Sequence, residues 1–213
     1  LLRAISFVSH RMGSTLLFEG VEEEEELIAC FMLGGRLVQG FLFGKAEGNF
    51  QNCEKYKTYL QNVMSEYLLF RTAELAQINL RRNDFIQTLI GLSNQIAFDL
   101  GQTFDERLNQ LAAKTSAHTK SLALFDFKGN QISSFFSRTD NHGWHEKKLD
   151  TDENISWSPF FQQSLAHHRF SNQLYFLSEP YQDLKNGFLY LSVSILVQNQ
   201  YILIAEMDLA GDF

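Results

Sequence analysis

Short apolar runs and helix-spaced stripes alternate along the first part of the chain. A helical pattern over residues 1–11 precedes an apolar run at residues 15–18. Glutamates at positions 22–26 then open a second helical pattern, which Gly34 and Gly35 end before the apolar run 37–43. The apolar stripe of that second helix consists of Leu27, Ile28, Phe31 and Met32. This order predicts one helix followed by a βαβ unit.

The middle of the chain, residues 52–118, has a helical pattern throughout. It contains no Pro, and its glycines stand at positions 91 and 101. The polar group at residues 79–84 predicts a break between two helices, with Asn83 or Asp84 capping the second helix. The apolar stripes of these helices either pack on the chain's own domain or form a signalling linker that pairs two subunits.

The last third of the chain alternates in the manner of strands. We expect strands over residues 121–127, 131–137, 174–178, 188–197 and 201–209, a loop over 139–154 and a helix over 156–168. The order is a long helix, two strands, a helix and three strands. It predicts an α+β module with a five-stranded antiparallel sheet and helices on one side.

Composition narrows the classes of partner. The 18 Lys and Arg against 25 Asp and Glu give a formal charge of −7, so we expect no nucleic acid or anionic membrane as the main partner. No apolar stretch reaches the ~20 residues of a membrane span. Cys30 and Cys53 form no C-x-x-C pair, which predicts no disulfide framework and a reducing, cytoplasmic location.

Candidate chemistry begins where the first apolar run ends. Glu19 stands there with Gly20 behind it, and functional groups occupy such strand ends in barrels of βα units. The sequence Glu-Gly-Val-Glu at residues 19–22, followed by Gln-Gly-Phe-Leu-Phe-Gly at residues 39–44, resembles the C-terminal end of an EAL domain. EAL domains are TIM-barrel phosphodiesterases that hydrolyse the bacterial messenger cyclic di-GMP to linear pGpG with Mg²⁺ or Mn²⁺.

This resemblance implies catalytic roles for three side chains. Glu19 matches the glutamate that holds the metal and the nucleophilic water, and Gln39 matches a glutamine that lines the same site. Glu22 matches the second glutamate of the motif, which has a supporting role. The other interpretation is that Glu19 is an ordinary acidic residue at a strand end.

The rest of the EAL active site would precede these residues. The family's Glu-Ala-Leu signature, paired aspartates, catalytic lysine and metal-binding asparagine have no counterpart in the chain. We therefore expect a C-terminal portion of a larger parent protein that begins inside a domain, has no activity alone and holds no cofactor alone. Two alternatives stay open: the parent is a non-catalytic cyclic di-GMP receptor, or the chain is a stand-alone dimerising or ligand-binding sensor module.

A second resemblance covers the last part of the chain. Its order of elements, and the sequences at residues 160–165, 178–183 and 206–209, resemble the PAS/Cache superfamily of sensor domains and the sensor module that follows EAL domains. The resemblance implies an unidentified small-molecule ligand between the sheet and the loop that holds the short helix.

The matching positions are candidate sensor-ligand residues. They are Trp157, Phe160, Tyr175, Tyr181 and Asp183, with Asp208 as a weaker candidate. Aromatic faces attract a cation, and a carboxylate neutralises it. Ser158 and Pro159 stand where amino-acid-binding relatives have an arginine, which argues against amino-acid recognition. The alternative is that the aromatic side chains fill the core.

Two pairs of histidines are interpreted without a metal. His142 with His145, and His167 with His168, lack the several convergent ligands that a metal site needs. They are expected as solvated loop and helix-end residues, and His168 as a cation favoured by the end of its helix.

Three regions follow from these patterns. We predict the C-terminal βαβ portion of an EAL barrel at residues 1–47, a helical linker at 48–118 and a PAS/Cache-like sensor at 119–213. The assembled protein is expected to be a homodimer.

Overall fold

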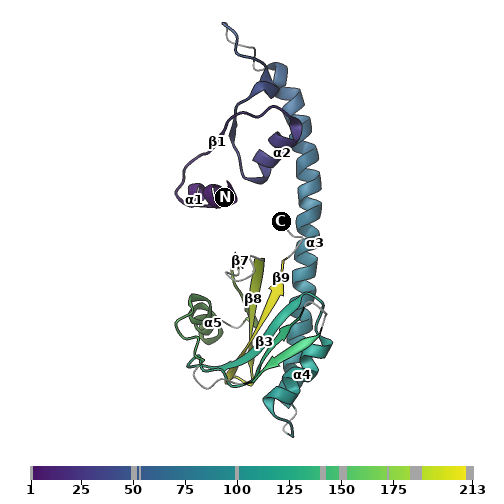
Figure 1. The fold of residues 1–213 in the computed structure, drawn as a ribbon, viewed down its shortest axis with the longest axis vertical. Helices are drawn as coiled ribbons and strands as arrows, with labels where there is room; N and C mark the ends of the chain where they lie inside the picture. The colour runs from purple at the N-terminus through teal and green to yellow at the C-terminus, as the bar shows by residue number, and fades with distance from the viewer. Residues whose placement is uncertain are drawn as a thin grey trace. The chain divides into compact units, whose positions relative to one another are not determined.

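The chain forms two compact units, Leu1–Ala76 and Gln77–Phe213, each of which is considered by itself. The computed structural model describes residues 2–48, 52, 54–98, 101–139, 143–148, 153–171, 173–182 and 189–209, and only the backbone of 95–98 and 182. The long helix α3 contributes to both units (Figure 1). The sequence predicted three regions, divided at residues 47 and 118, and this division stays a prediction.

The first unit contains the predicted βαβ arrangement. Its elements are α1 (Leu2–Arg11), β1 (Leu17–Phe18), α2 (Glu24–Met32), β2 (Leu37–Val38), the 3₁₀ helix η1 (Phe41–Phe43) and the first part of α3 (Glu54–Phe98). Strands β1 and β2 pair in parallel, with Leu17 opposite Leu37 and Phe18 opposite Val38. Helix α2 packs on α3, because Leu27 and Cys30 are buried in one cluster with Val63.

The second strand of this unit is shorter than predicted. It ends at Val38, and residues 41–43 turn into η1. The amide of Leu42 donates to the carbonyl of Val21, and the amide of Phe43 donates to that of Gly40, so these amides serve a turn instead of a ladder. The described residues form a two-stranded sheet here, and the tail of a TIM barrel stays a prediction.

Helix α3 is continuous where the sequence predicted a break. It runs from Glu54 to Phe98 without interruption, so the break at residues 79–84 is wrong. The buried stripe continues through that stretch, with Ile78, Phe85 and Leu89 at 2%, 2% and 0% exposure. Because residues 79–84 contain no Gly or Pro, burial on one face outweighs their modest helix propensity. None of the described helices is long and apolar enough to cross a membrane.

The second unit is built on one antiparallel sheet, which confirms the α+β class. Its strands are β3 (Thr119–Asp126), β4 (Phe135–Arg138), β5 (Trp144–Lys147), β6 (Tyr175–Leu177), β7 (Tyr181–Gln182), β8 (Leu189–Val197) and β9 (Tyr201–Asp208). The order is β5-β4-β3-β9-β8-β6, and β7 pairs with β8. The five predicted strands are present, but the count of five is wrong because β5 and β7 add to them.

Helices cover both faces of this sheet, whereas the sequence predicted one. Helices α3 and α4 (Phe104–Lys114) pack on one face through Leu89, Leu108 and Leu111. Helix α5 (Pro159–Phe170) packs on the other face, where Phe161 joins Phe125. Figure 1 shows the sheet lying between α5 and the pair α3 and α4. Alternation along the strands supplies an apolar side chain to each layer.

Hydrogen bonds of side chains interrupt the backbone ladder at residues 133 and 134. The amide of Leu124 donates to the hydroxyl of Ser133 at 2.9 Å. The amide and hydroxyl of Ser134 both donate to the carboxylate of Asp105, at 2.6 and 2.9 Å. These side-chain bonds satisfy groups that a regular ladder would satisfy, so β4 begins later than predicted, at Phe135.

His168 is buried in the interface between α5 and the sheet, contrary to the prediction of a solvated cation. Its Nε2 lies 3.0 Å from the hydroxyl of Ser194, which also accepts a hydrogen bond from Ser164 at 2.6 Å. Burial lowers the pKa of His168, and the neighbouring His167 lowers it further. The folded state therefore favours the neutral form of His168.

The first prediction tests the continuity of α3. Asn83 is exposed in the middle of the helix, so Asn83→Pro should lower the free energy of unfolding by about 3 kcal/mol or more and reduce helicity. Asn83→Ala should change it by no more than about 0.5 kcal/mol. Urea unfolding followed by circular dichroism measures both. If the helix broke here with Asn83 as its cap, the alanine variant would instead lose about 1 kcal/mol.

The second prediction concerns His168 and pH. The unfolded chain binds the histidine proton near the ordinary pKa of about 6.5, whereas the folded chain resists it. Stability is therefore fully present above that pH and falls as the pH drops through the lowered folded pKa. Urea midpoints at about pH 7.5 and about pH 5.5 should show this loss, and His168→Gln should make the difference smaller. An unchanged difference in the variant would contradict the assignment to His168.

Candidate functional site

The first candidate site lies at the ends of β1 and β2. Glu19 follows β1 and Gln39 follows β2, and the parallel pairing brings these two strand ends together. The amide of Gln39 donates to the carbonyl of Phe18 at 2.7 Å, and its carbonyl accepts from the amide of Val21 at 3.1 Å. The backbone of Gln39 is thus hydrogen-bonded to Phe18, which precedes Glu19, and to Val21, which follows it.

The glycines beside these two residues have separate physical reasons. Gly20 has a φ of +77°, a left-handed conformation that costs other residues free energy. At Gly40 a Cβ atom would lie 1.9 Å from the carbonyl oxygen of Val21. The two loops therefore cross at a distance that only glycine permits.

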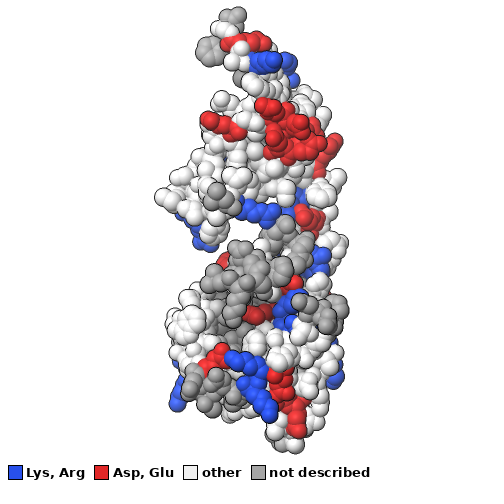
Figure 2. All heavy atoms as spheres, viewed as in Figure 1, with Lys and Arg blue, Asp and Glu red and all other residues white. Residues whose placement is uncertain are grey.

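The glutamate run forms the start of α2. One carboxylate oxygen of Glu26 accepts hydrogen bonds from the amides of Glu22 and Glu23, at 2.8 and 3.2 Å. These bonds lower the pKa of the Glu26 carboxyl. Figure 2 shows acidic side chains gathered over the start of α2, in agreement with the exposure of residues 22–26. Glu22 therefore contributes its backbone to the helix start, while its side chain is exposed.

The strand-end residues offer ligands for a hard divalent cation but no complete set. Glu19, Glu22 and Gln39 are all exposed, and carboxylate and amide oxygens suit Mg²⁺ or Mn²⁺. Within the described part of the chain no three His, Cys, Asp or Glu side chains converge to hold a metal. The chemistry of Glu19 fits the cation as one ligand among others.

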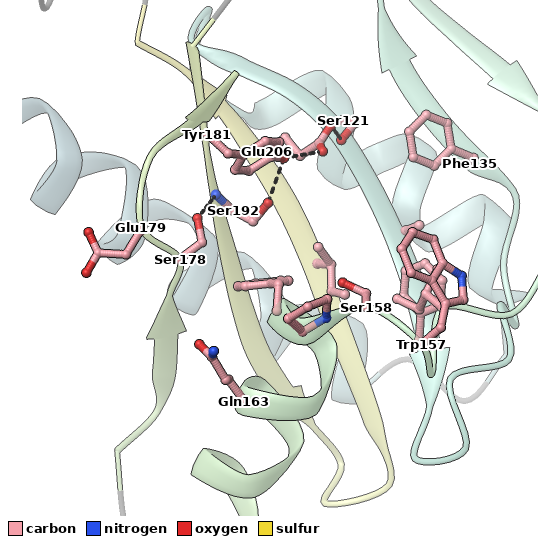
Figure 3. Close-up of a pocket in the computed structure, with 16 residues that line it drawn as sticks. Ser121, Phe135, Trp157, Ser158, Gln163, Ser178, Glu179, Tyr181, Ser192 and Glu206 are labelled. Atoms are coloured by element: carbon pink, nitrogen blue, oxygen red, sulfur yellow. Dashed lines mark hydrogen bonds between the residues drawn. The ribbon is translucent and has the colours of Figure 1, made fainter. Parts of the chain in front are cut away.

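The second candidate site is a cavity of about 540 Å³ in the second unit. It lies between α5 and the face of the sheet that α5 covers, and its walls are mainly apolar. Figure 3 shows Glu206, Ser121, Tyr181 and Ser192 at one end and Trp157 at the other. Its volume is in the range of pockets that bind small molecules.

The structure separates the predicted sensor-ligand residues. Trp157, Phe160 and Tyr181 line the cavity. Tyr175 packs against the core on the α3 and α4 side of the sheet. Asp183 lies outside the described residues. The weaker candidate Asp208 forms an ion pair with Lys120 at 3.1 Å and does not line the cavity.

Glu206 is the residue that the sequence reasoning missed. Its two carboxylate oxygens accept hydrogen bonds from the hydroxyls of Ser121 and Tyr181, both at 2.6 Å. The Tyr181 oxygen lies 2.9 Å from the hydroxyl of Ser192. Because Tyr181 has one proton and donates it to Glu206, Ser192 must donate to Tyr181. The chain of donors therefore runs from Ser192 through Tyr181 to Glu206.

A signal for this group was present in the strand patterns. The sequence of β9 places Ile202, Ile204 and Glu206 on one face, so a carboxylate stands where an aliphatic side chain is expected. The sequence of β8 places Ser192 and Ser194 on the same face of the sheet, opposite the apolar residues. Polar residues at alternate positions of two central strands indicate that this face of the sheet borders a polar-lined cavity and not an apolar core.

The other three histidines of the two pairs differ in their surroundings. His167 lies 5.2 Å from the ring of Phe176, so its ring contributes to packing. His145 is an exposed residue of β5, and His142 lies outside the described residues.

Comparison with known proteins gives one relative that spans nearly the whole chain. The chain is 20% identical over 206 residues to YkuI of Bacillus subtilis (strain 168), described as an uncharacterized EAL-domain containing protein. The match covers 97% of this chain and 50% of YkuI, so the chain spans about half the length of that relative. No family model matches the chain.

Solved structures extend this comparison to the fold. The crystal structure of YkuI in complex with substrate cyclic di-GMP and calcium has a TM-score of 0.81 at 20% identity, over 97% of this chain and 52% of that chain. The ligand-binding domain of the Campylobacter jejuni chemoreceptor Tlp3 with L-valine has a TM-score of 0.51 at 15% identity, over 77% and 66% of the two chains.

The extracellular domain of the histidine kinase vpHK1S-Z8 also has a TM-score of 0.51, at 12% identity, over 72% of this chain and 60% of that one. These two receptor domains share the fold alone with this chain. The chain is thus homologous over most of its length to an EAL-domain protein and has the fold of about half of that protein.

Proposed function

We propose that this chain is the C-terminal part of a cyclic di-GMP signalling protein whose parent hydrolyses cyclic di-GMP to linear pGpG. The carrying observation is the homology to YkuI over 97% of the chain, since a YkuI crystal structure holds cyclic di-GMP as substrate. The adjacent positions of Glu19 and Gln39 at two parallel strand ends support the same proposal.

The proposed roles follow from the chemistry of the side chains. The carboxylate of Glu19 would bind a divalent cation or orient the attacking water, and the amide of Gln39 would line the site beside it. Glu22 would support Glu19 from the start of α2. A bound Mg²⁺ or Mn²⁺ would supply charge neutralisation of the phosphodiester and a lower pKa for its bound water.

The chain alone is proposed to be inactive. The described residues of the first unit contribute one parallel strand pair, whereas a TIM barrel needs eight strands and draws its catalytic residues from several of them. The receptor alternative, in which the parent binds cyclic di-GMP without cleaving it, is an outcome of the experiment below. The presence of both Glu19 and Gln39 favours hydrolysis.

The second unit is proposed to be a Cache-like sensor that controls the parent, in the cytoplasm and as a homodimer. The cavity beside Glu206 supports a sensing role, because it offers a binding volume separate from the strand-end site. Exposed apolar side chains on α3, Leu69 at 75% and Phe70 at 70%, support self-association.

The third prediction tests the strand-end site in the full-length parent. Glu19→Gln should lower the turnover of cyclic di-GMP with Mg²⁺ by at least about 100-fold, because it removes an anionic ligand. Glu25→Gln removes the same charge from the exposed first turn of α2 and should leave turnover within about twofold of the unchanged protein. Full activity of the Glu19 variant would overturn the assignment. Binding without turnover in the unchanged parent would instead identify a receptor.

The fourth prediction tests control by the sensor. A deletion from residue 119 would uncover the buried Phe85 and Leu89 of α3, so the deletion should begin at residue 77. The shortened parent should differ from the full protein in turnover by at least about fivefold, the usual lower range of allosteric coupling. Leu69 and Phe70 stay in the shortened parent, so its mass in solution should remain that of a dimer. If turnover did not change, the regulatory proposal would fail.

A further inference from the structure

The cavity of the second unit has a one-sided charge. Glu206 and Glu179 line it, and none of its described lining residues is Lys, Arg or His. Glu206 stands at the end beside Tyr181 and Ser192, whereas the exposed Glu179, on the segment between β6 and β7, directs its carboxylate away from them (Figure 3). An anion in this space would meet the carboxylate of Glu206 and no described cationic side chain, which is unfavourable in a partly desolvated site.

Glu206 is held in place for a ligand by its own hydrogen bonds. Ser121 and Ser192 are buried at 5% and 4% exposure. The hydroxyls of Ser121 and Tyr181 donate to the carboxylate, and Ser192 donates to Tyr181. Each oxygen of an ionised carboxylate has two acceptor positions, so a donor from a ligand can be added to the bonds already formed. A fixed carboxylate loses little conformational freedom when it binds a cation.

Aromatic rings form the path from this carboxylate to the opening. Phe125, Phe135 and Phe160 line the wall, and Trp157 is 76% exposed beside them. Phe160 is itself fixed by stacking on Phe176, with ring centroids 5.7 Å apart and planes inclined by 29°. Aromatic faces attract organic cations and bury their apolar bodies.

We infer that this cavity binds an organic amine with an aromatic or alkyl body and without a carboxylate, whose ammonium group donates to Glu206. The inference deepens the sensor role proposed above and rests on it only for the consequence in the cell. Amino acids are disfavoured because their carboxylate would lie in the same acidic cavity without a described partner.

The experiment compares three probes that share an indole ring. Isothermal titration calorimetry of the full chain measures binding of tryptamine, a cation, of tryptophan, which adds a carboxylate, and of indole-3-propionate, an anion. Tryptamine should bind at least about tenfold more tightly than tryptophan, and indole-3-propionate should not bind measurably. Equal or tighter binding of either carboxylate compound, or no binding of tryptamine, would overturn the inference.

Two matched variants identify the carboxylate that binds the ammonium group. Glu206→Gln keeps the size of the side chain and should weaken tryptamine binding by at least about tenfold, whereas Glu179→Gln at the exposed edge should weaken it less than about threefold. The reverse order would overturn the role of Glu206. If circular dichroism shows that Glu206→Gln is unfolded, the comparison of the three probes on the unchanged chain still tests whether the cavity prefers an amine without a carboxylate.

This test is independent of the catalytic proposal. If tryptamine binds and the parent's turnover does not change, the proposal of sensor control fails and the proposal of an amine site stands. Loss of turnover in the Glu19 variant together with no tryptamine binding would keep the catalytic proposal and remove the amine site.

Discussion

The alternation of side chains along β9 is the constraint on which the second unit depends. Leu203, Ala205 and Met207 enter the core beneath α3 and α4, while Ile204 and Glu206 face the cavity. A shift of one residue would exchange the two sets and place a carboxylate in an apolar core, at a cost of several kcal/mol. Pairing with β3 on one side and β8 on the other fixes the register, and with it the place of Glu206.

The long central strands could be predicted because this alternation is visible in the sequence. Strand β5 was missed because three of its four residues are exposed at the sheet edge, so its pattern resembles a loop. Strand β7 has only two residues. The partners of Glu206 were beyond sequence reasoning for another reason, since Ser121, Tyr181 and Ser192 come from three other strands and meet only when the sheet has formed.

At α3 and at His168, burial outweighs the local preferences of the sequence. Polar residues at 79–84 predicted an end to the helix, but the spacing of Ile78, Phe85 and Leu89 keeps one face buried through them. The end of a helix favours a charged histidine in solvent. Desolvation outweighs this preference at His168, because the ring lies against the sheet. At the strand ends, the sequence predicted Glu19 directly after the first strand, but it placed Gln39 inside the second strand, which in the structure already ends at Val38.

The crossing at Gly40 limits how sequences homologous to this chain can change. Any side chain there would collide with the backbone of Val21, and Val21 lies between Glu19 and the start of α2. A homologue that has lost glycine at this position must therefore have rearranged the loop that carries its acidic residue, whether or not the acid itself is retained. The position is a marker of intact site geometry that can be checked in a genome sequence before any protein is purified.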